Sequence, residues 1–245
     1  MLKNLLIFTY FFLYKTIINY QGFVESSLTV HLSESDRKSH RIISMKKNKR
    51  QTTQSIKKLV IVGDSDCGKR SLLFSFSTNE FITDYTARTL ELPTVTIPID
   101  QKTIHLTLVD VSGTEHLHDL RSLIYNETHI ILICFSVDNP ASAGNVLNKW
   151  VPEIRIQCNR CPIILVACKV DLRTDARTIA TLSTRDEAPV TTEKGQQIAA
   201  EIKANAYMEC SAKTHEGVQD LLLEAARLLS KQHSHRTVKC RCILQ

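Results

Sequence analysis

From about residue 56 onward, the chain alternates short apolar runs with longer segments in which apolar residues recur every three or four positions. The short runs are typical of strands buried on both faces, and the longer segments of amphipathic helices. The expected strands are residues 57–62, 94–99, 103–109, 129–135, 161–168 and 206–210, and the expected helices are residues 68–77, 140–157, 192–204 and 215–231. This order predicts an α/β fold with helices on both faces of a mostly parallel sheet that has one antiparallel hairpin, closed near residues 100–102.

The two ends of the chain differ in composition from the middle. Residues 5–14 form a mostly apolar run that is too short to cross a bilayer, and residues 30–55 are polar and basic. A stretch of the second kind buries too little apolar surface to fold alone. Met45 is a plausible second start, so residues 1–44 are either absent from the product or a poorly ordered addition. We expect an extension over residues 1–55, a domain over residues 56–231 and a tail over residues 232–245.

The charge and the cysteine content limit the classes of function that this chain can have. The net charge of +6 is concentrated at the ends, and we find no basic helix with interleaved aromatic residues of the kind that binds nucleic acid. Three of the eight cysteines, Cys134, Cys168 and Cys210, lie in apolar runs, where a reduced thiol acts as a small hydrophobe and indicates a reducing compartment. Cys158 and Cys161 form a lone C-x-x-C, for which we expect a surface loop rather than a metal or redox site.

Residues 63–70 read Gly-Asp-Ser-Asp-Cys-Gly-Lys-Arg, between an expected strand and an expected helix. Loops of the form G-x-x-x-x-G-K-[ST] turn backbone N–H groups toward a phosphate chain while the Lys reaches the outer phosphates. Gly63, Gly68 and Lys69 match this form, but Arg70 replaces the hydroxyl residue that normally ligates Mg²⁺. The sequence predicts a phosphate-binding loop with an altered magnesium site, and the alternative is a glycine-containing turn without a ligand.

Three further short motifs come after the phosphate-binding loop, each at the end of an expected strand. Asp110 ends one strand and can hold Mg²⁺ through water, and Gly113 can offer its N–H to a terminal phosphate. Asp171 can accept hydrogen bonds from two donors of guanine, and the stem of Lys169 can lie along the base. Residues 209–213 can place a backbone N–H against the guanine carbonyl. Each motif alone is weak evidence, but the order of the motifs and their places at strand ends together predict a guanine-nucleotide site.

With these motifs, the chain from about residue 56 to its end resembles the small GTPases of the Rho family. The likeness includes Trp150, the run Pro-Ile-Ile-Leu-Val at 162–166, and residues 173–189, which match the helical insert that marks Rho proteins. It implies a Ras-like P-loop fold, a six-stranded sheet, and GTP or GDP as the cofactor. The nucleotide-binding positions that it implies are Gly63, Asp64, Ser65, Asp66, Cys67, Gly68, Lys69, Arg70, Ser71, Phe81, Asp110, Gly113, Lys169, Asp171, Ser211, Ala212 and Lys213.

The resemblance also implies partners. Effector proteins would bind through two switch regions, residues 82–95 and 113–126, the second of which keeps Arg121 and Leu123 on a helical docking surface. The last four residues, Cys-Ile-Leu-Gln, resemble a prenylation box in which Cys242 is farnesylated. Because one lipid binds membranes only marginally, basic tail residues and a palmitoyl group on Cys240 would supply the second signal. We expect the chain at the cytoplasmic face of a membrane, the plasma membrane.

Several positions depart from the hydrolysing members of that family. Ser65 stands where they have a Gly and would crowd the attacking water, and Thr114 replaces the Gln that orients this water and is too short to reach it. Together with Ser112, these changes resemble the Rnd branch of the Rho family, whose members hydrolyse GTP poorly. We therefore expect slow or defective hydrolysis, with Thr114 as the degenerate catalytic position.

Two changes go beyond that branch and leave Mg²⁺ binding open. Arg70 replaces one metal ligand, and Arg88 stands where the first switch normally supplies a magnesium-binding Thr. Ser71 is turned about 100° around the helix from Arg70 and is a poor substitute. Either the Arg70 guanidinium replaces part of the lost positive charge without a metal, or the pocket has decayed.

The function that these observations favour is a GTP-binding signalling protein of the Rho family at a membrane. The alternative is a nucleotide-free pseudo-GTPase that acts as a prenylated protein-interaction module. A working GTPase ranks third, because it requires Arg70, Arg88 and Thr114 to be tolerated together.

Overall fold

The sheet has six strands in the order β2-β3-β1-β4-β5-β6. The computed structural model describes residues 56–81, 94–99, 102–111 and 118–237, which lie in one compact unit. The strands are β1 (Lys57–Gly63), β2 (Thr94–Ile99), β3 (Lys102–Asp110), β4 (Ile130–Ser136), β5 (Ile163–Cys168) and β6 (Ala206–Cys210). β2 pairs with β3 in an antiparallel hairpin and the other pairs are parallel, which confirms the predicted fold class.

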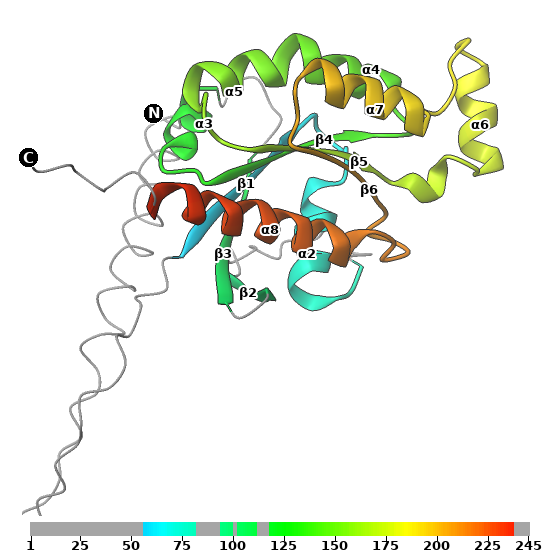
Figure 1. Ribbon diagram of the computed structural model, residues 1–245. Helices are drawn as coiled ribbons and strands as arrows, with labels where there is room; N and C mark the ends of the chain where they lie inside the picture. Colours follow the sequence, from blue (N-terminus) through cyan, green and yellow to red (C-terminus); the bar gives the residue numbers. More distant parts are fainter. Residues whose placement is uncertain (1–55, 82–93, 100–101, 112–117, 238–245) are drawn as a thin grey trace, which may run out of the picture. The chain divides into compact units, whose positions relative to one another are not determined.

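Helices cover both faces of this sheet (Figure 1). They are α2 (Lys69–Thr78), α3 (His118–Tyr125), α4 (Pro140–Asn145), α5 (Val151–Gln157), α6 (Ala176–Ser183), α7 (Thr192–Glu201) and α8 (Val218–Thr237). Leu59 and Ile61 pack with α2 and α8, whereas Val60 and Val62 pack with α3, α4, α5 and α7. Alternate residues of β1 thus enter two different cores, as a continuous apolar strand requires. Within the described part of the chain, no helix is long and apolar enough to cross a membrane.

The expected helix over residues 140–157 is divided into three pieces. α4 ends at Asn145, a π-helical turn spans Val146–Trp150, and α5 begins at Val151. Pro152 lacks an N–H group and its ring crowds the carbonyl four residues earlier, so regular helical hydrogen bonding cannot continue through it. The wider turn absorbs this irregularity and directs the buried Trp150 toward the loop after β1.

The expected insert over residues 173–189 contains α6. Its start is fixed by Asp175, whose carboxylate accepts a hydrogen bond from the N–H of Thr178 at 2.8 Å. This is the usual way in which an Asp before a helix satisfies a free N–H donor. The helical character of the insert is therefore confirmed.

Other boundaries differ from the expected ones. β5 begins after Pro162, because a proline cannot donate to the strand ladder. α7 ends at Glu201 rather than at residue 204, and the start of α8 is delayed by His215 and Gly217, which both have positive φ. α8 then continues to Thr237, past the expected end at residue 231, and α3 is the helix that was expected only as the docking surface of the second switch region.

Candidate functional site

The loop after β1 has the backbone that the motif predicts. A Cβ at Gly63 (φ 145°) would collide with the carbonyl oxygen of Cys134, and Gly68 has a left-handed φ of 99°. Only glycine adopts both conformations at low cost. α2 begins directly after Gly68, which has no side chain to cap it, so the first N–H groups of the helix can bind an anion.

Lys69 is held over this loop by backbone carbonyls. Its side chain is buried, and its Nζ donates to the carbonyl oxygens of Gly63 at 2.9 Å and Asp64 at 2.6 Å. The contact with Cys67 Sγ, at 3.7 Å, is long and weak. Because an ammonium group has three N–H donors, one remains for a phosphate oxygen.

The Asp64 carboxylate is directed away from the loop toward the helical layer. It accepts hydrogen bonds from Asn145 Nδ2 at 2.6 Å and Trp150 Nε1 at 2.8 Å. Asp64 therefore contributes its backbone to the phosphate cradle, while its side chain fixes the loop to the neighbouring helices. Sequence reasoning missed this role of Asn145 and Trp150, because no spacing rule links residues so far apart.

Replacing Trp150 by Phe tests this anchor. The ring is kept but the N–H is lost, so the Trp150→Phe variant is expected to unfold with a free energy about 1–3 kcal/mol lower, the usual cost of a missing buried partner. The measurement is urea unfolding followed by far-UV circular dichroism. A stability equal to that of the native chain would show that the bond to Asp64 does not hold the loop.

Arg70 and Asp110 form the part of the site where a magnesium ion would be expected. Asp110 ends β3 beside the loop, because β1 and β3 pair in register at Ile61 and Asp110. Arg70 Nε lies 3.5 Å from Asp110 Oδ2, and Asp110 Oδ1 is buried without a hydrogen-bond partner among the described residues. Ser71, the nearest hydroxyl residue in sequence, is buried on α2.

The residues present do not fit the magnesium site of the resembled family. Position 70 supplies no hydroxyl ligand, and its cation faces the Asp110 carboxylate. Over the described ranges, no group of three His, Cys, Asp or Glu side chains could hold a metal ion. Arg88, the position that would carry the second hydroxyl ligand, lies outside the described residues.

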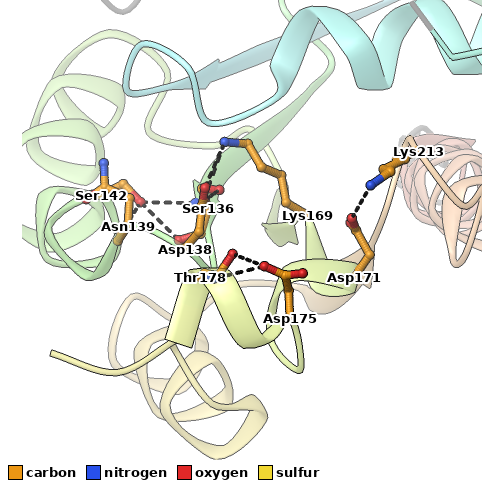
Figure 2. Close-up of polar contacts among 9 residues, drawn as sticks. All are labelled: Ser136, Asp138, Asn139, Ser142, Lys169, Asp171, Asp175, Thr178 and Lys213. Carbon is orange, nitrogen blue, oxygen red and sulfur yellow. Dashed lines mark hydrogen bonds and ion pairs between the residues drawn. The ribbon is translucent and has the colours of Figure 1, made fainter. Parts of the chain in front are cut away.

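Lys169 forms one side of the expected base pocket. Its backbone is left-handed (φ 59°), and its stem lies against the phosphate loop, since a Cβ at Gly68 would be 3.9 Å from Lys169 Cγ. Its Nζ lies 3.2 Å from Asp138 Oδ2, and Asp138 also accepts a hydrogen bond from the Ser136 hydroxyl (Figure 2). The ion pair keeps the Lys169 stem in one direction across the pocket.

Asp171 follows Lys169 by two residues, and its carboxylate is held by residues after β6. Its Oδ1 accepts a hydrogen bond from the Ser211 hydroxyl at 2.6 Å, and Ser211 Oγ itself accepts from the Thr214 N–H at 3.1 Å. Lys213 Nζ lies 4.0 Å from Asp171 Oδ2 (Figure 2). A carboxylate offers about four acceptor positions, so this one can still accept two donors from a base.

These groups gather at the carboxyl ends of β1, β3, β5 and β6, the edge where open α/β sheets bind ligands. Ser65 and Asp66 are exposed there. They line a pocket of about 290 Å³ with Asp138, Asn139, Pro140, Lys169, Leu182, Arg185 and Glu187. Phe81 is partly exposed shortly after α2, and Ala212 follows Ser211. Gly113, Thr114, Cys240 and Cys242 lie outside the described residues.

Four free cysteines, Cys67, Cys134, Cys168 and Cys210, are buried near this edge. Burial raises the pKa of Cys67 to about 12 and also raises the pKa of Cys134. A thiol that stays protonated is a poor nucleophile, so Cys67 and Cys134 act as packing residues. The expectation that the cysteines of the apolar strands are buried is confirmed.

The surface loop expected for the C-x-x-C pair is confirmed, and the structure adds a bond within it. Cys158 and Cys161 do lie in a turn after α5, where the Cys161 N–H donates to the Cys158 carbonyl at 3.1 Å. However, the structure joins their sulfur atoms in a disulfide. The turn explains this, because it brings the two Cα atoms to 5.6 Å, inside the range that a disulfide spans.

The second switch region contains a buried ionic group that sequence reasoning missed. Arg121 was expected on a docking surface, but it is 2% exposed and forms a two-pronged ion pair with Glu153 on α5. Tyr125 donates to the same carboxylate at 2.7 Å, and the Arg121 guanidinium lies 5.4 Å from the Trp150 ring centre. Leu123, by contrast, is 67% exposed and can contact a partner.

Known proteins are similar to this chain in sequence. Residues 58–231 match the Ras family. GTP-binding protein rho1 of Schizosaccharomyces pombe is 43% identical over 199 residues, which cover 78% of this chain and 98% of that protein. Rho-related GTP-binding protein RhoB of Homo sapiens is 46% identical over 171 residues, which cover 70% of this chain and 87% of that protein. The chain therefore belongs to the Ras family, among its Rho-type members.

Proposed function

We propose that the chain is a Rho-type signalling protein that binds guanine nucleotides and hydrolyses GTP slowly. The observation that carries the proposal is that two half-sites, one for phosphate and one for a base, lie at the same edge of the sheet. Lys69 is held over the phosphate loop by two carbonyls and has a third donor that only a long contact with Cys67 Sγ occupies, and Asp171 is oriented by Ser211 to accept from a base. The names of the relatives rho1 and RhoB, both GTP-binding proteins, support the same ligand class.

Guanine fits the second half-site better than adenine does. The ring N1–H and the exocyclic amine of guanine are adjacent donors, and the Asp171 carboxylate offers two oxygens as acceptors. Adenine has no N1–H, so it would leave one of these oxygens without its donor. Competition of unlabelled GDP, GTP and ATP against fluorescent GDP on the full chain tests this: GDP and GTP should displace the probe, and equal displacement by ATP would contradict the assignment.

Slow hydrolysis follows from the residues around the expected water position. Ser65 adds a side chain in the phosphate loop, and Thr114 stands in place of the water-orienting Gln. Membership of the Rnd branch stays a prediction based on these two positions, Ser112, Cys168 and the run at residues 171–175.

Restoring both residues is expected to restore hydrolysis. A Ser65→Gly, Thr114→Gln double variant should hydrolyse bound GTP faster by about tenfold or more, because a positioned water accelerates the step. Single-turnover assays on the native chain, each single variant and the double variant measure this. A double variant as slow as the native chain would place the defect elsewhere in the site.

The tail supports action at the cytoplasmic face of the plasma membrane. Cys242 would carry the lipid, while Cys240 and the basic residues Arg236, Lys239 and Arg241 would supply the second signal. Effectors would dock through residues 82–95 and 113–126. A Cys242→Ser variant should move from the membrane fraction to the soluble fraction, whereas a Cys210→Ser control, altered at a buried thiol, should not. Unchanged fractionation of the Cys242→Ser variant would contradict lipid attachment at this residue.

A further inference from the structure

We propose that Arg70 is a built-in cation of the nucleotide site, which holds the phosphates without a divalent metal ion. The inference rests on the proposed function, because it concerns the same site. Arg70 is the second residue of α2 and directly follows Lys69. Its side chain therefore leaves the chain at the helix end whose N–H groups face a bound phosphate chain.

The Arg70 side chain lies against the carboxylate that would otherwise serve a metal. Its Nε is 3.5 Å from Asp110 Oδ2, and its side chain is 59% exposed. A guanidinium has five N–H donors in a planar fork, so an Nε that faces Asp110 leaves four donors for phosphate oxygens, and a two-pronged contact with the carboxylate still leaves three. One side chain can thus balance the Asp110 carboxylate and the phosphates together.

The buried oxygen of Asp110 supports this arrangement. Oδ1 has no hydrogen-bond partner among the described residues, although a buried carboxylate oxygen requires a donor. The guanidinium fork can supply one by rotating to contact both oxygens, the usual geometry of an Arg–carboxylate pair. A decayed pocket would place no demand on where Arg70 points, whereas the observed ion pair keeps its charge at the phosphate end.

A magnesium ion would compete poorly for the same position. The hydroxyl that should ligate it is missing at position 70, and the Arg70 cation would repel a dication beside Asp110. Because the arginine is covalently part of the chain, a chelator cannot remove it. Nucleotide binding should therefore be insensitive to EDTA.

The test is the affinity of the full chain for fluorescent GDP, measured in excess Mg²⁺ and in excess EDTA. For the native chain, the dissociation constant should change by less than about threefold between the two buffers. Arg70→Thr restores a hydroxyl and removes the cation, so in EDTA it should bind at least about tenfold more weakly and recover in Mg²⁺. Arg160→Thr, the same change in the exposed turn between α5 and β5, is the matched control and should behave as the native chain does.

The outcomes separate this inference from the proposed function. If the native chain binds GDP in Mg²⁺ but its affinity falls by about tenfold or more in EDTA, the proposed role of Arg70 is wrong and the proposed function still stands. If the Arg70→Thr variant binds GDP in EDTA with native affinity, the proposed role of Arg70 is also wrong. A native chain that binds in neither buffer contradicts the proposed function, and the inference fails with it. The chelation comparison on the native chain decides the matter even if the variant does not fold.

Discussion

The Glu153→Ala variant is expected to unfold with a free energy about 3–5 kcal/mol below that of the native chain, the usual cost of removing one member of a buried ion pair. Glu153 Oε1 and Oε2 each accept a hydrogen bond of 2.8 Å from Arg121, whose side chain is 2% exposed. Glu153 also accepts from Tyr125, and both burial and this hydrogen bond raise the pKa of the phenol, so that it remains a donor. Without the carboxylate, the buried Arg121 guanidinium and the Tyr125 hydroxyl lose these three hydrogen bonds.

Urea unfolding measures this effect, with two comparisons. The double variant Arg121→Met, Glu153→Leu removes both charges and should lose less stability than Glu153→Ala alone. Glu224→Ala breaks a pair with Arg227, whose side chain is 57% exposed, and should cost no more than about 1 kcal/mol. A loss of less than about 1 kcal/mol for Glu153→Ala as well would mean that the network does not stabilise the fold.

The second large effect is expected in ligand binding. Lys69→Ala should weaken GDP binding by about 100-fold, the upper range for losing a charge-assisted hydrogen bond to a phosphate. The Lys69 ammonium is already oriented by two loop carbonyls, so its contact with the phosphate requires little further ordering.

Fluorescent-GDP titration of the full chain measures this change. Lys194→Ala, at an exposed position on α7, is the control and should bind as the native chain does. Circular dichroism of both variants checks that the fold is kept. A folded Lys69→Ala variant with native affinity would show that the phosphates are not bound at this loop.

The sheet could be predicted because its signals are local. β4 and β5 are apolar at every position but Ser136, a pattern that fits parallel strands buried on both faces. The phosphate loop could be predicted for a similar reason, since Gly63 and Gly68 are required by positive φ angles within one short turn.

The polar contacts between distant segments could not be predicted in this way. Arg121 and Glu153 are 32 residues apart, and Trp150 and Asp64 are 86 apart, so no helical or strand period relates them. Arg121 in sequence resembles any exposed basic residue of a surface helix, and only packing against α5 shows that it is buried. For Arg70, the sequence left two alternatives open, a cation at the metal site or a decayed pocket, and the ion pair with Asp110 is seen only in the structure.

The most direct test of the central claim is the nucleotide content of the purified full chain. Bound nucleotide is released by denaturation and quantified by chromatography, after purification with and without Mg²⁺. We expect guanine nucleotide close to one per chain in both preparations, with GTP exceeding GDP because hydrolysis is slow. A folded chain without nucleotide in either preparation would contradict this account and favour a pseudo-GTPase that acts only through its protein partners.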